Sequence, residues 1–321
     1  MPWDLIPLNS GYSIPSLAYG TGTLGSGQWP IDQLTQAFDT GFYHIDTAQL
    51  YRNEAEVGVT IGELGLERSD VFITTKFSGY NGLDIPTSIQ NSLEYLNTSY
   101  VDLYLIHNPD IAVPDIPTVW AQMEKVQEAG FARSIGVSNF NEKQLEILLS
   151  SAKIKPAANQ RGRSTIKIYL HPYNYQQQSP TLEYAAKYDI VIEAYGALTP
   201  VTSEPGGPVD VPLSEIATRL GATNDQVLLA WIKAKGAVVV TTSSKKARLL
   251  SYLAAGDIAL SAEDVKAIDT AGAIGEKRIT VKHGLRKLGV GVVFGILILV
   301  ACSYFKGRNK RRNVVEAMWR H

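Results

Sequence analysis

The chain has 321 residues, of which 45% are hydrophobic and 19% charged, as in an ordinary folded protein with one large domain or two small ones. The net charge of −1 hides an asymmetry: eleven of the 30 Lys and Arg residues but only two of the 31 acids lie from Glu276 onward, which leaves 19 basic against 29 acidic residues before it. This acidic body excludes a basic nucleic-acid surface, and the single cysteine, Cys302, excludes an internal disulfide and a cysteine metal cluster.

Short β-branched runs alternate with helical patterns along the chain. Eight runs predict strands, at residues 16–21, 43–48, 71–77, 101–108, 132–139, 156–160, 190–196 and 237–243. Amphipathic segments between them predict helices, at residues 31–41, 53–65, 88–97, 118–130, 142–153, 181–189 and 224–235, mostly preceded by Asp, Asn, Ser or Pro.

This repeating order indicates an α/β protein whose parallel sheet closes into a (β/α)8 TIM barrel over residues 1–275. A doubly wound open sheet is the alternative architecture. No GxGxxG opens a helix after an early strand, and the strand count matches closure, so the barrel is favoured.

Four polar residues stand where predicted strands give way to loops: Asp46 and Tyr51 after the second strand, Lys76 at the end of the third and His107 at the end of the fourth. Functional residues of such barrels lie at the carboxyl ends of the strands. Reduction of a carbonyl by hydride needs a proton at the developing oxyanion. A tyrosine can supply it if an ammonium such as Lys76 stabilises the phenolate, if Asp46 keeps that lysine charged, and if His107 orients the substrate oxygen.

The chain resembles the aldo-keto reductases in several stretches between about residues 5 and 272, which occur in the family's order and spacing. They are GFYHIDTAQLYRNEAEVG, TTKF, DLYLIHNP, SIGVSNF, NQ, HPYNYQQ, EAYGALTP and VVVTTSSKKARL. It looks closest to the fungal branch that reduces activated ketones such as α-keto amides and esters. The resemblance implies an NADPH-dependent reductase of small-molecule carbonyls with a monomeric catalytic domain and Tyr51 as proton donor, the tetrad being completed by Asp46, Lys76 and His107.

The resemblance also implies a set of cofactor contacts. Ser138, Asn139 and Gln160 would hold the nicotinamide carboxamide, and Tyr195 would stack on the nicotinamide ring. At the adenine end the Lys-Ser pair of NADPH-preferring members is replaced by Thr242-Ser243. Ser243 and Arg248 remain to grip the 2′-phosphate, with Lys245 or Lys246 supplying charge.

Two departures from the family pattern bear on function. Asn108 replaces the aromatic residue that follows the histidine in many relatives, which predicts a more polar pocket wall and a preference for small or activated carbonyls. About seven extra residues, 161–167, follow Gln160. They are compatible with a tolerated loop at the barrel mouth, a disruption of cofactor binding, or an error in the gene model.

The end of the chain predicts a separate membrane unit. Residues 288–305 are uncharged over eighteen positions, between a basic linker at 276–287 and a basic tail at 306–321. A single helix of that length can just cross a bilayer, so we expect a single-pass anchor. Because both flanks are basic, charge does not settle the orientation; the need for cytosolic NADPH favours a catalytic domain in the cytosol. The first thirteen residues lack a secretory signal pattern.

Two functions are therefore compatible with the sequence. The first is a membrane-anchored, NADPH-dependent carbonyl reductase. The second is a catalytically inactive nucleotide-binding subunit of the same fold that regulates a membrane partner, as in the channel-associated branch. The complete tetrad favours the reductase. The five histidines show no ligand spacing, so we expect no metal and interpret His44 and His171 as structural residues.

Overall fold

The computed structural model describes residues 3–161 and 170–278. The chain divides into two compact units, Met1–Ala273 and Ile274–His321, and the first of them contains the fold described below. The predicted membrane segment 288–305, the basic tail 306–321, most of the basic linker 276–287 and six of the seven extra residues at 161–167 lie outside the described residues. No helix in the described ranges is both long enough and apolar enough to cross a membrane.

The predicted barrel is confirmed. Its eight strands are all parallel and close in the order β10, β3, β4, β5, β6, β7, β8, β9. They are β3 (Leu17–Gly20), β4 (His44–Asp46), β5 (Phe72–Phe77), β6 (Val101–Ile106), β7 (Ala132–Ser138), β8 (Ala158–Arg161), β9 (Val191–Tyr195) and β10 (Val238–Thr241). Each overlaps one of the eight predicted runs.

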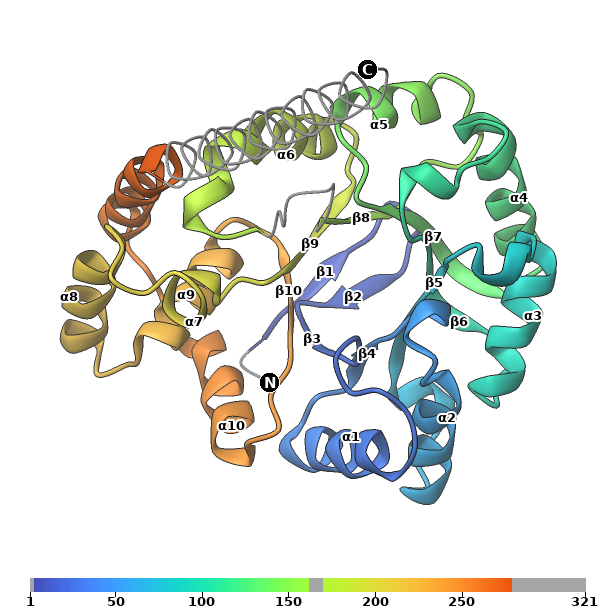
Figure 1. The fold of residues 1–321 in the computed structure, drawn as a ribbon, viewed down its shortest axis with the longest axis horizontal. Coiled ribbons are helices and arrows are strands. Elements are labelled where there is room, and N and C mark those ends of the chain that lie inside the picture. Colours follow the sequence, from blue (N-terminus) through green and yellow to red (C-terminus); the bar gives the residue numbers. More distant parts are fainter. Residues whose placement is uncertain (1–2, 162–169, 279–321) are drawn as a thin grey trace, which may run out of the picture. The chain divides into compact units, whose positions relative to one another are not determined.

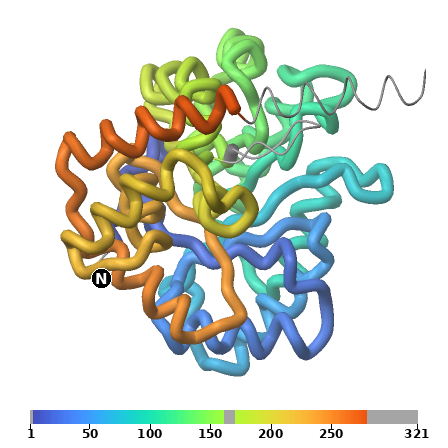
Figure 2. Tube along the Cα trace, turned by 60° about the vertical axis from the view of Figure 1, so that its left-hand side comes forward, coloured from blue at the N-terminus to red at the C-terminus, as the bar shows by residue number. Residues whose placement is uncertain are grey.

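Helices surround the barrel in chain order (Figure 1). The α-helices are α1 (Gln28–Thr40), α2 (Glu54–Glu63), α3 (Ile85–Tyr95), α4 (Ile116–Glu128), α5 (Glu142–Leu149), α6 (Tyr175–Lys187), α7 (Thr199–Thr202), α8 (Asp210–Leu220), α9 (Asn224–Ala234) and α10 (Lys246–Ala254), and residues 262–273 are also helical. Short 3-10 helices lie at η1 (Gln49–Tyr51), η2 (Arg68–Asp70), η3 (Tyr80–Gly82), η4 (Pro109–Ile111), η5 (Pro172–Asn174) and η6 (Ala255–Asp257). The tube in Figure 2 passes around the barrel from blue through green to orange, so β10 returns to pair with β3.

Several helices begin where the sequence supplies a cap. The side chains of Asp84, Asp115, Asn141 and Thr223 each accept a hydrogen bond from a backbone N–H in the first turn of α3, α4, α5 and α9. Such caps satisfy amide groups that have no partner inside the helix. Asn141 directly precedes the helix predicted at 142–153, whereas α3 and α4 begin two to three residues earlier than predicted, at the caps Asp84 and Asp115.

A hairpin that the sequence patterns did not indicate precedes the barrel. Strands β1 (Leu5–Pro7) and β2 (Ser13–Pro15) pair antiparallel, and Leu8 and Ile14 pack into one apolar cluster with residues of the barrel strands, several of which stand at the amino ends of those strands. The strand residues of this cluster are Leu103, Leu105, Ala157, Ala158 and Val238, with Phe72 and Val191 packed against them. Apolar side chains thus fill the amino end of the barrel, which leaves its carboxyl end for polar groups.

We predict that Gly136→Ala in β7 destabilises the full chain by about 1–3 kcal/mol. A Cβ at this position would lie 2.5 Å from the Ala158 carbonyl oxygen and 2.7 Å from Leu105 Cδ2, so the barrel wall must shift. Gly62→Ala in α2 is the matched control, because its Cβ would meet nothing within 4 Å. It should be neutral or stabilising, since alanine favours helix. Urea unfolding of both variants measures the difference; equal stabilities would contradict the prediction.

Candidate active site

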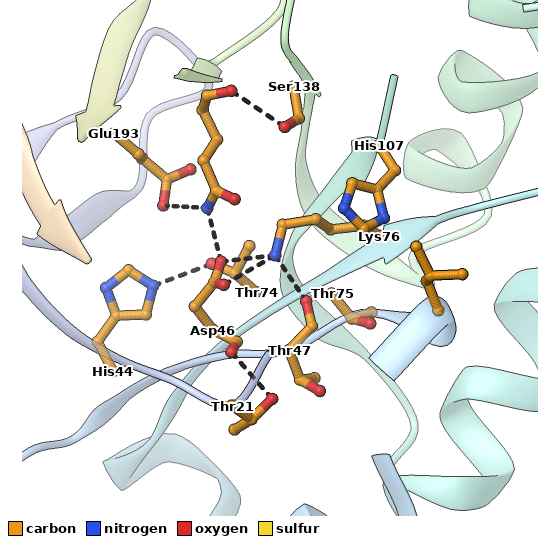
Figure 3. Close-up of polar contacts among 12 residues, drawn as sticks. Thr21, His44, Asp46, Thr47, Thr74, Thr75, Lys76, His107, Ser138 and Glu193 are labelled. Carbon is orange, nitrogen blue, oxygen red and sulfur yellow. Dashed lines mark hydrogen bonds and ion pairs between the residues drawn. The ribbon is translucent and has the colours of Figure 1, made fainter. Parts of the chain in front are cut away.

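A buried ion pair joins two neighbouring strands at the carboxyl end of the barrel. The ammonium group of Lys76 on β5 donates to both carboxylate oxygens of Asp46 on β4, each at 2.8 Å, and to the Thr47 carbonyl oxygen at 2.7 Å (Figure 3). Both side chains are almost completely buried. Burial alone would lower the pKa of Lys76, but the charge and hydrogen bonds of Asp46, together with Tyr51 and Glu193, raise that pKa above its ordinary value. Lys76 is therefore a charged group inside the barrel.

Tyr51 stands beside this ammonium. It ends η1, five residues after β4, and the Lys76 Nζ atom lies 5.1 Å from the centroid of its ring. Gly22 allows the ring to lie close to the β3 loop, because a Cβ there would lie 3.1 Å from Tyr51 Cζ. Burial raises the pKa of the Tyr51 phenol, and the charge of Lys76 opposes that rise. The phenol is therefore held protonated, next to a cation that would stabilise its anion.

His107 lies against Tyr51. It follows β6, and its ring meets that of Tyr51 edge to face with centroids 5.6 Å apart. Burial and the charge of Lys76 lower the pKa of His107 to about 3, so the imidazole is neutral. Its Nδ1 atom lies 2.8 Å from the Ser78 hydroxyl, whereas that hydroxyl lies 3.4 Å from its other acceptor, the Lys76 carbonyl oxygen. The shorter contact favours donation from Ser78 to Nδ1, which leaves the ring proton on Nε2.

The predicted nicotinamide contacts form one connected group on β7 and β8. The Ser138 hydroxyl donates to the Gln160 carbonyl oxygen at 3.0 Å, and the Asn139 backbone N–H donates to the same oxygen at 2.8 Å. The Asn139 side-chain nitrogen donates to the His107 carbonyl oxygen at 2.8 Å. Its side-chain oxygen is buried and has no hydrogen-bond partner among the described residues. A buried, unpaired acceptor at this place fits a ligand with an amide donor.

A cavity of about 520 Å³ lies at these groups. Tyr51, His107, Ser138, Asn139, Gln160 and Tyr195 line it, and so do Thr242, Arg248 and Tyr252. A cavity of this size that is lined by amide and hydroxyl groups and by a guanidinium fits a dinucleotide.

The predicted adenine-end residues are only partly in place. Arg248 lies in the first turn of α10 and lines the cavity. Ser243 and Lys245 are not among the residues that line it: the Ser243 hydroxyl accepts the Lys245 backbone N–H at 3.1 Å, and Lys245 is the N-cap of α10. Asn108, predicted to form a pocket wall, is also not among the residues that line the cavity. It is the N-cap residue of η4, and its side-chain oxygen accepts the Asp110 backbone N–H.

The sequence patterns missed two residues of this site. Ser78, which contacts His107, has no distinguishing signal, because a serine after a strand is common in loops. Glu193 is fully buried in β9, and its carboxyl group lies 3.4 Å from the Gln160 amide nitrogen. Burial and the neighbouring Asp46 raise the pKa of Glu193 to about 8. An acid inside the apolar run IVIEAYG was the available signal.

The two histidines interpreted as structural have local partners. His44 is fully buried, with Nδ1 at 3.1 Å from the Pro15 carbonyl oxygen and Nε2 at 2.9 Å from the Thr74 hydroxyl. His171 accepts the Tyr173 backbone N–H through Nδ1. The described residues contain no group of three or more His, Cys, Asp or Glu side chains arranged to hold a metal ion.

Comparison with known proteins identifies similar chains. A family model described as the aldo/keto reductase family matches residues 16–273. An NAD/NADP-dependent indole-3-acetaldehyde reductase of Schizosaccharomyces pombe is 35% identical over 85% of this chain and 97% of its own length. Human aldo-keto reductase family 1 member C3 is 34% identical over 82% of this chain and 90% of its own. The crystal structure of a Bombyx mori aldo-keto reductase in complex with NADP matches with a TM-score of 0.75 at 30% identity, over 84% of this chain and 92% of that one.

We predict that Lys76→Met destabilises the full chain by about 3–5 kcal/mol at neutral pH, because it leaves a buried carboxylate without its cation. Only 3% of the surface of Asp46 is exposed to solvent, so water cannot replace the ammonium group. The double variant Asp46→Asn, Lys76→Met removes both charges and should recover part of the loss. Urea unfolding of the three proteins measures this. A double variant no more stable than Lys76→Met would contradict the prediction.

Proposed function

The chain belongs to the aldo/keto reductase family, which makes it an NADP-dependent oxidoreductase, and we propose that it reduces aldehydes and activated ketones to alcohols with Tyr51 as the proton donor. The observation that carries this proposal is the position of the Tyr51 phenol at the cavity, between the charged Lys76 and the neutral His107. This arrangement supports proton transfer to an oxygen that gains negative charge.

The residues at the cavity fit NADPH. Bound NADPH supplies the hydride. Asn139 offers a buried, unpaired oxygen to a carboxamide N–H, and Ser138, Gln160 and Tyr195 line the same cavity. Arg248, which also lines it, fits a phosphate group, since a guanidinium recognises phosphate by paired hydrogen bonds. NADPH is therefore the preferred cofactor in this proposal.

Each residue of the tetrad has one task in the proposed reaction. Tyr51 donates its proton to the carbonyl oxygen, and Lys76 stabilises the phenolate that remains. Asp46 keeps Lys76 charged and fixes its position through two hydrogen bonds. His107, with its proton on Nε2, donates a hydrogen bond that orients the substrate oxygen. The pairing of a charged lysine with a neutral histidine supports this division of tasks.

The substrate range is proposed from chemistry and similarity. The relative from Schizosaccharomyces pombe is named as an indole-3-acetaldehyde reductase, which supports an aldehyde as one substrate. We propose activated ketones such as α-keto amides and esters as further substrates, because their electron-poor carbonyl accepts hydride readily.

We also propose that residues 288–305 anchor the protein in a membrane, with the catalytic domain in the cytosol. The support is the sequence: eighteen uncharged residues stand between basic flanks, and this length suffices to cross a bilayer. An anchored reductase would act on carbonyl compounds that partition into or near the membrane.

We predict that Tyr51→Phe lowers the kcat for carbonyl reduction by about 100-fold or more, because the proton donor is lost. The assay follows NADPH oxidation by the full chain in detergent, with α-keto esters and aliphatic aldehydes as substrates. Tyr95→Phe is the matched control, since Tyr95 is exposed on α3, and it should keep wild-type activity. NADPH binding, followed by fluorescence, should persist in both variants.

Three outcomes separate the candidate functions. Loss of turnover in Tyr51→Phe with retained NADPH binding supports the reductase and its proton donor. Undiminished turnover in Tyr51→Phe rules out that residue as the donor. A wild-type chain that binds NADPH but reduces no aldehyde or activated ketone would favour the inactive regulatory subunit.

We predict that the full chain remains in the membrane pellet after an alkaline carbonate wash, and that Leu297→Arg releases it into the supernatant. A charge at the centre of a membrane helix costs roughly 2.5–3.5 kcal/mol on insertion. Gly307→Arg adds the same charge outside the apolar segment and should stay in the pellet. Extraction of the wild-type chain by carbonate would refute the anchor.

A further inference from the structure

Glu193 is a buried acid to which the proposed mechanism gives no role. It lies in the middle of β9. Val191, two residues before it, packs against the apolar cluster, and Tyr195, two residues after it, lines the cavity. Alternate residues of a strand share a face, so Glu193 points into the barrel between these two layers. Its side chain is completely buried, and its Oε1 atom has no hydrogen-bond partner among the described residues.

Gln160 links Glu193 to the ion pair. Its amide nitrogen donates to Asp46 Oδ2 at 2.6 Å and lies 3.4 Å from Glu193 Oε2 (Figure 3). Asp46 as a carboxylate can only accept hydrogen bonds, so the amide nitrogen rather than the amide oxygen must face it. The chain of contacts therefore runs from Glu193 through Gln160 and Asp46 to Lys76, the cation beside Tyr51.

The charged and titratable groups around Glu193 are few. Asp46 comes from β4, Lys76 from β5 and Tyr51 from η1, and all three interact electrostatically with Glu193. On the strands that pair with β9, Glu193 is in register with Gln160 of β8 and Val238 of β10, neither of which is charged. With Glu193 protonated, one anion faces one cation. Because Glu193, Asp46 and Lys76 are all buried, its ionisation would place two anions beside the single cation that the described residues supply there.

We propose that Glu193 is a positioning residue whose proton sets the strength of Tyr51 as a proton donor, acting through Gln160, Asp46 and Lys76. This inference rests on the proposed reductase function. With its proton in place, Glu193 leaves Asp46 as the single anion behind Lys76, and the ammonium charge remains available to the phenolate. Loss of the proton adds negative charge close to the phenol, which disfavours the phenolate and makes Tyr51 a weaker acid.

The raised pKa of Glu193, about 8, agrees with this geometry and gives the pH at which the effect appears. In the wild-type chain, kcat for carbonyl reduction should fall as the pH rises through about 8. Glu193→Gln keeps the shape of the protonated carboxyl but cannot ionise. Its kcat should equal that of the wild type in mild acid. The pH at which kcat decreases should lie about one unit or more above that of the wild type.

Two further variants make the test specific. Glu193→Met has a similar volume and no ionisable group, so it should also lack the fall near pH 8 and serves if Glu193→Gln does not fold. Glu124→Gln is the matched control for a buried Glu→Gln exchange, because Glu124 lies on α4 and accepts the backbone N–H groups of Lys153 and Ile154. Its pH profile should equal that of the wild type.

A second readout needs neither cofactor nor activity. Glu193 holds its proton up to a pH of about 8 in the folded chain but only to its ordinary value, 4.5, when unfolded. The folded state thus binds more protons between these values, and its stability falls as the pH rises through this window. The Tm of the wild type should therefore decrease relative to that of Glu193→Gln between pH 4.5 and about 8. Above that pH the difference between the two Tm values should stay constant.

The outcomes separate this inference from the proposed function. The role of Glu193 is supported if kcat of Glu193→Gln decreases only at a higher pH than that of the wild type, and if the Tm difference between the two proteins grows with pH. An active wild type whose pH profile is unchanged in both Glu193 variants overturns this role and leaves the reductase function intact. A wild type that reduces no carbonyl overturns the reductase function and with it the link to Tyr51, while the Tm series still shows whether Glu193 titrates.

Discussion

The buried pair of Lys76 and Asp46 is the interaction on which the rest of this site depends. An ammonium group inside a barrel loses its hydration, and the loss is tolerated only because both carboxylate oxygens and the Thr47 carbonyl oxygen accept its protons. The same carboxylate also accepts the amide of Gln160. One anion therefore holds both the cation beside Tyr51 and the amide of Gln160 at the cavity, so the proposed proton donor and the proposed cofactor contacts have a common support.

The division of the barrel interior into two layers makes this arrangement possible. The β1–β2 hairpin closes the amino end with Leu8 and Ile14, and the first residues of several strands complete that apolar layer. The carboxyl ends of the strands are left for polar groups. Because successive inward-facing residues of a strand differ by two positions, Val191, Glu193 and Tyr195 of β9 stand in turn in the apolar layer, in the polar layer and on the cavity wall.

Electrostatics gives neighbouring groups different protonation states at one pH. Lys76 keeps its proton because Asp46, with smaller contributions from Tyr51 and Glu193, offsets the cost of burial. His107 is neutral because burial and the charge of Lys76 both lower its pKa. Tyr51 lies between a cation and a neutral hydrogen-bond donor, which is the environment that a proton donor to an oxyanion requires. Glu193 completes the set as an acid whose protonated form keeps the second negative charge away.

Much of this could be predicted from the amino-acid order alone. Strand periodicity indicated all eight barrel strands, and the polar residues at their ends, Asp46, Lys76 and His107, meet because parallel strands bring their carboxyl ends to one edge. The proposal of a membrane anchor rests on local composition alone, since it depends only on the length of an uncharged run. The hairpin plug, the contact of Ser78 with His107 and the inward position of Glu193 could not be predicted in this way. They depend on which residues face one another across the closed barrel, and those pairings involve residues far apart in the chain whose types carry no local signal; only the tertiary structure decided them.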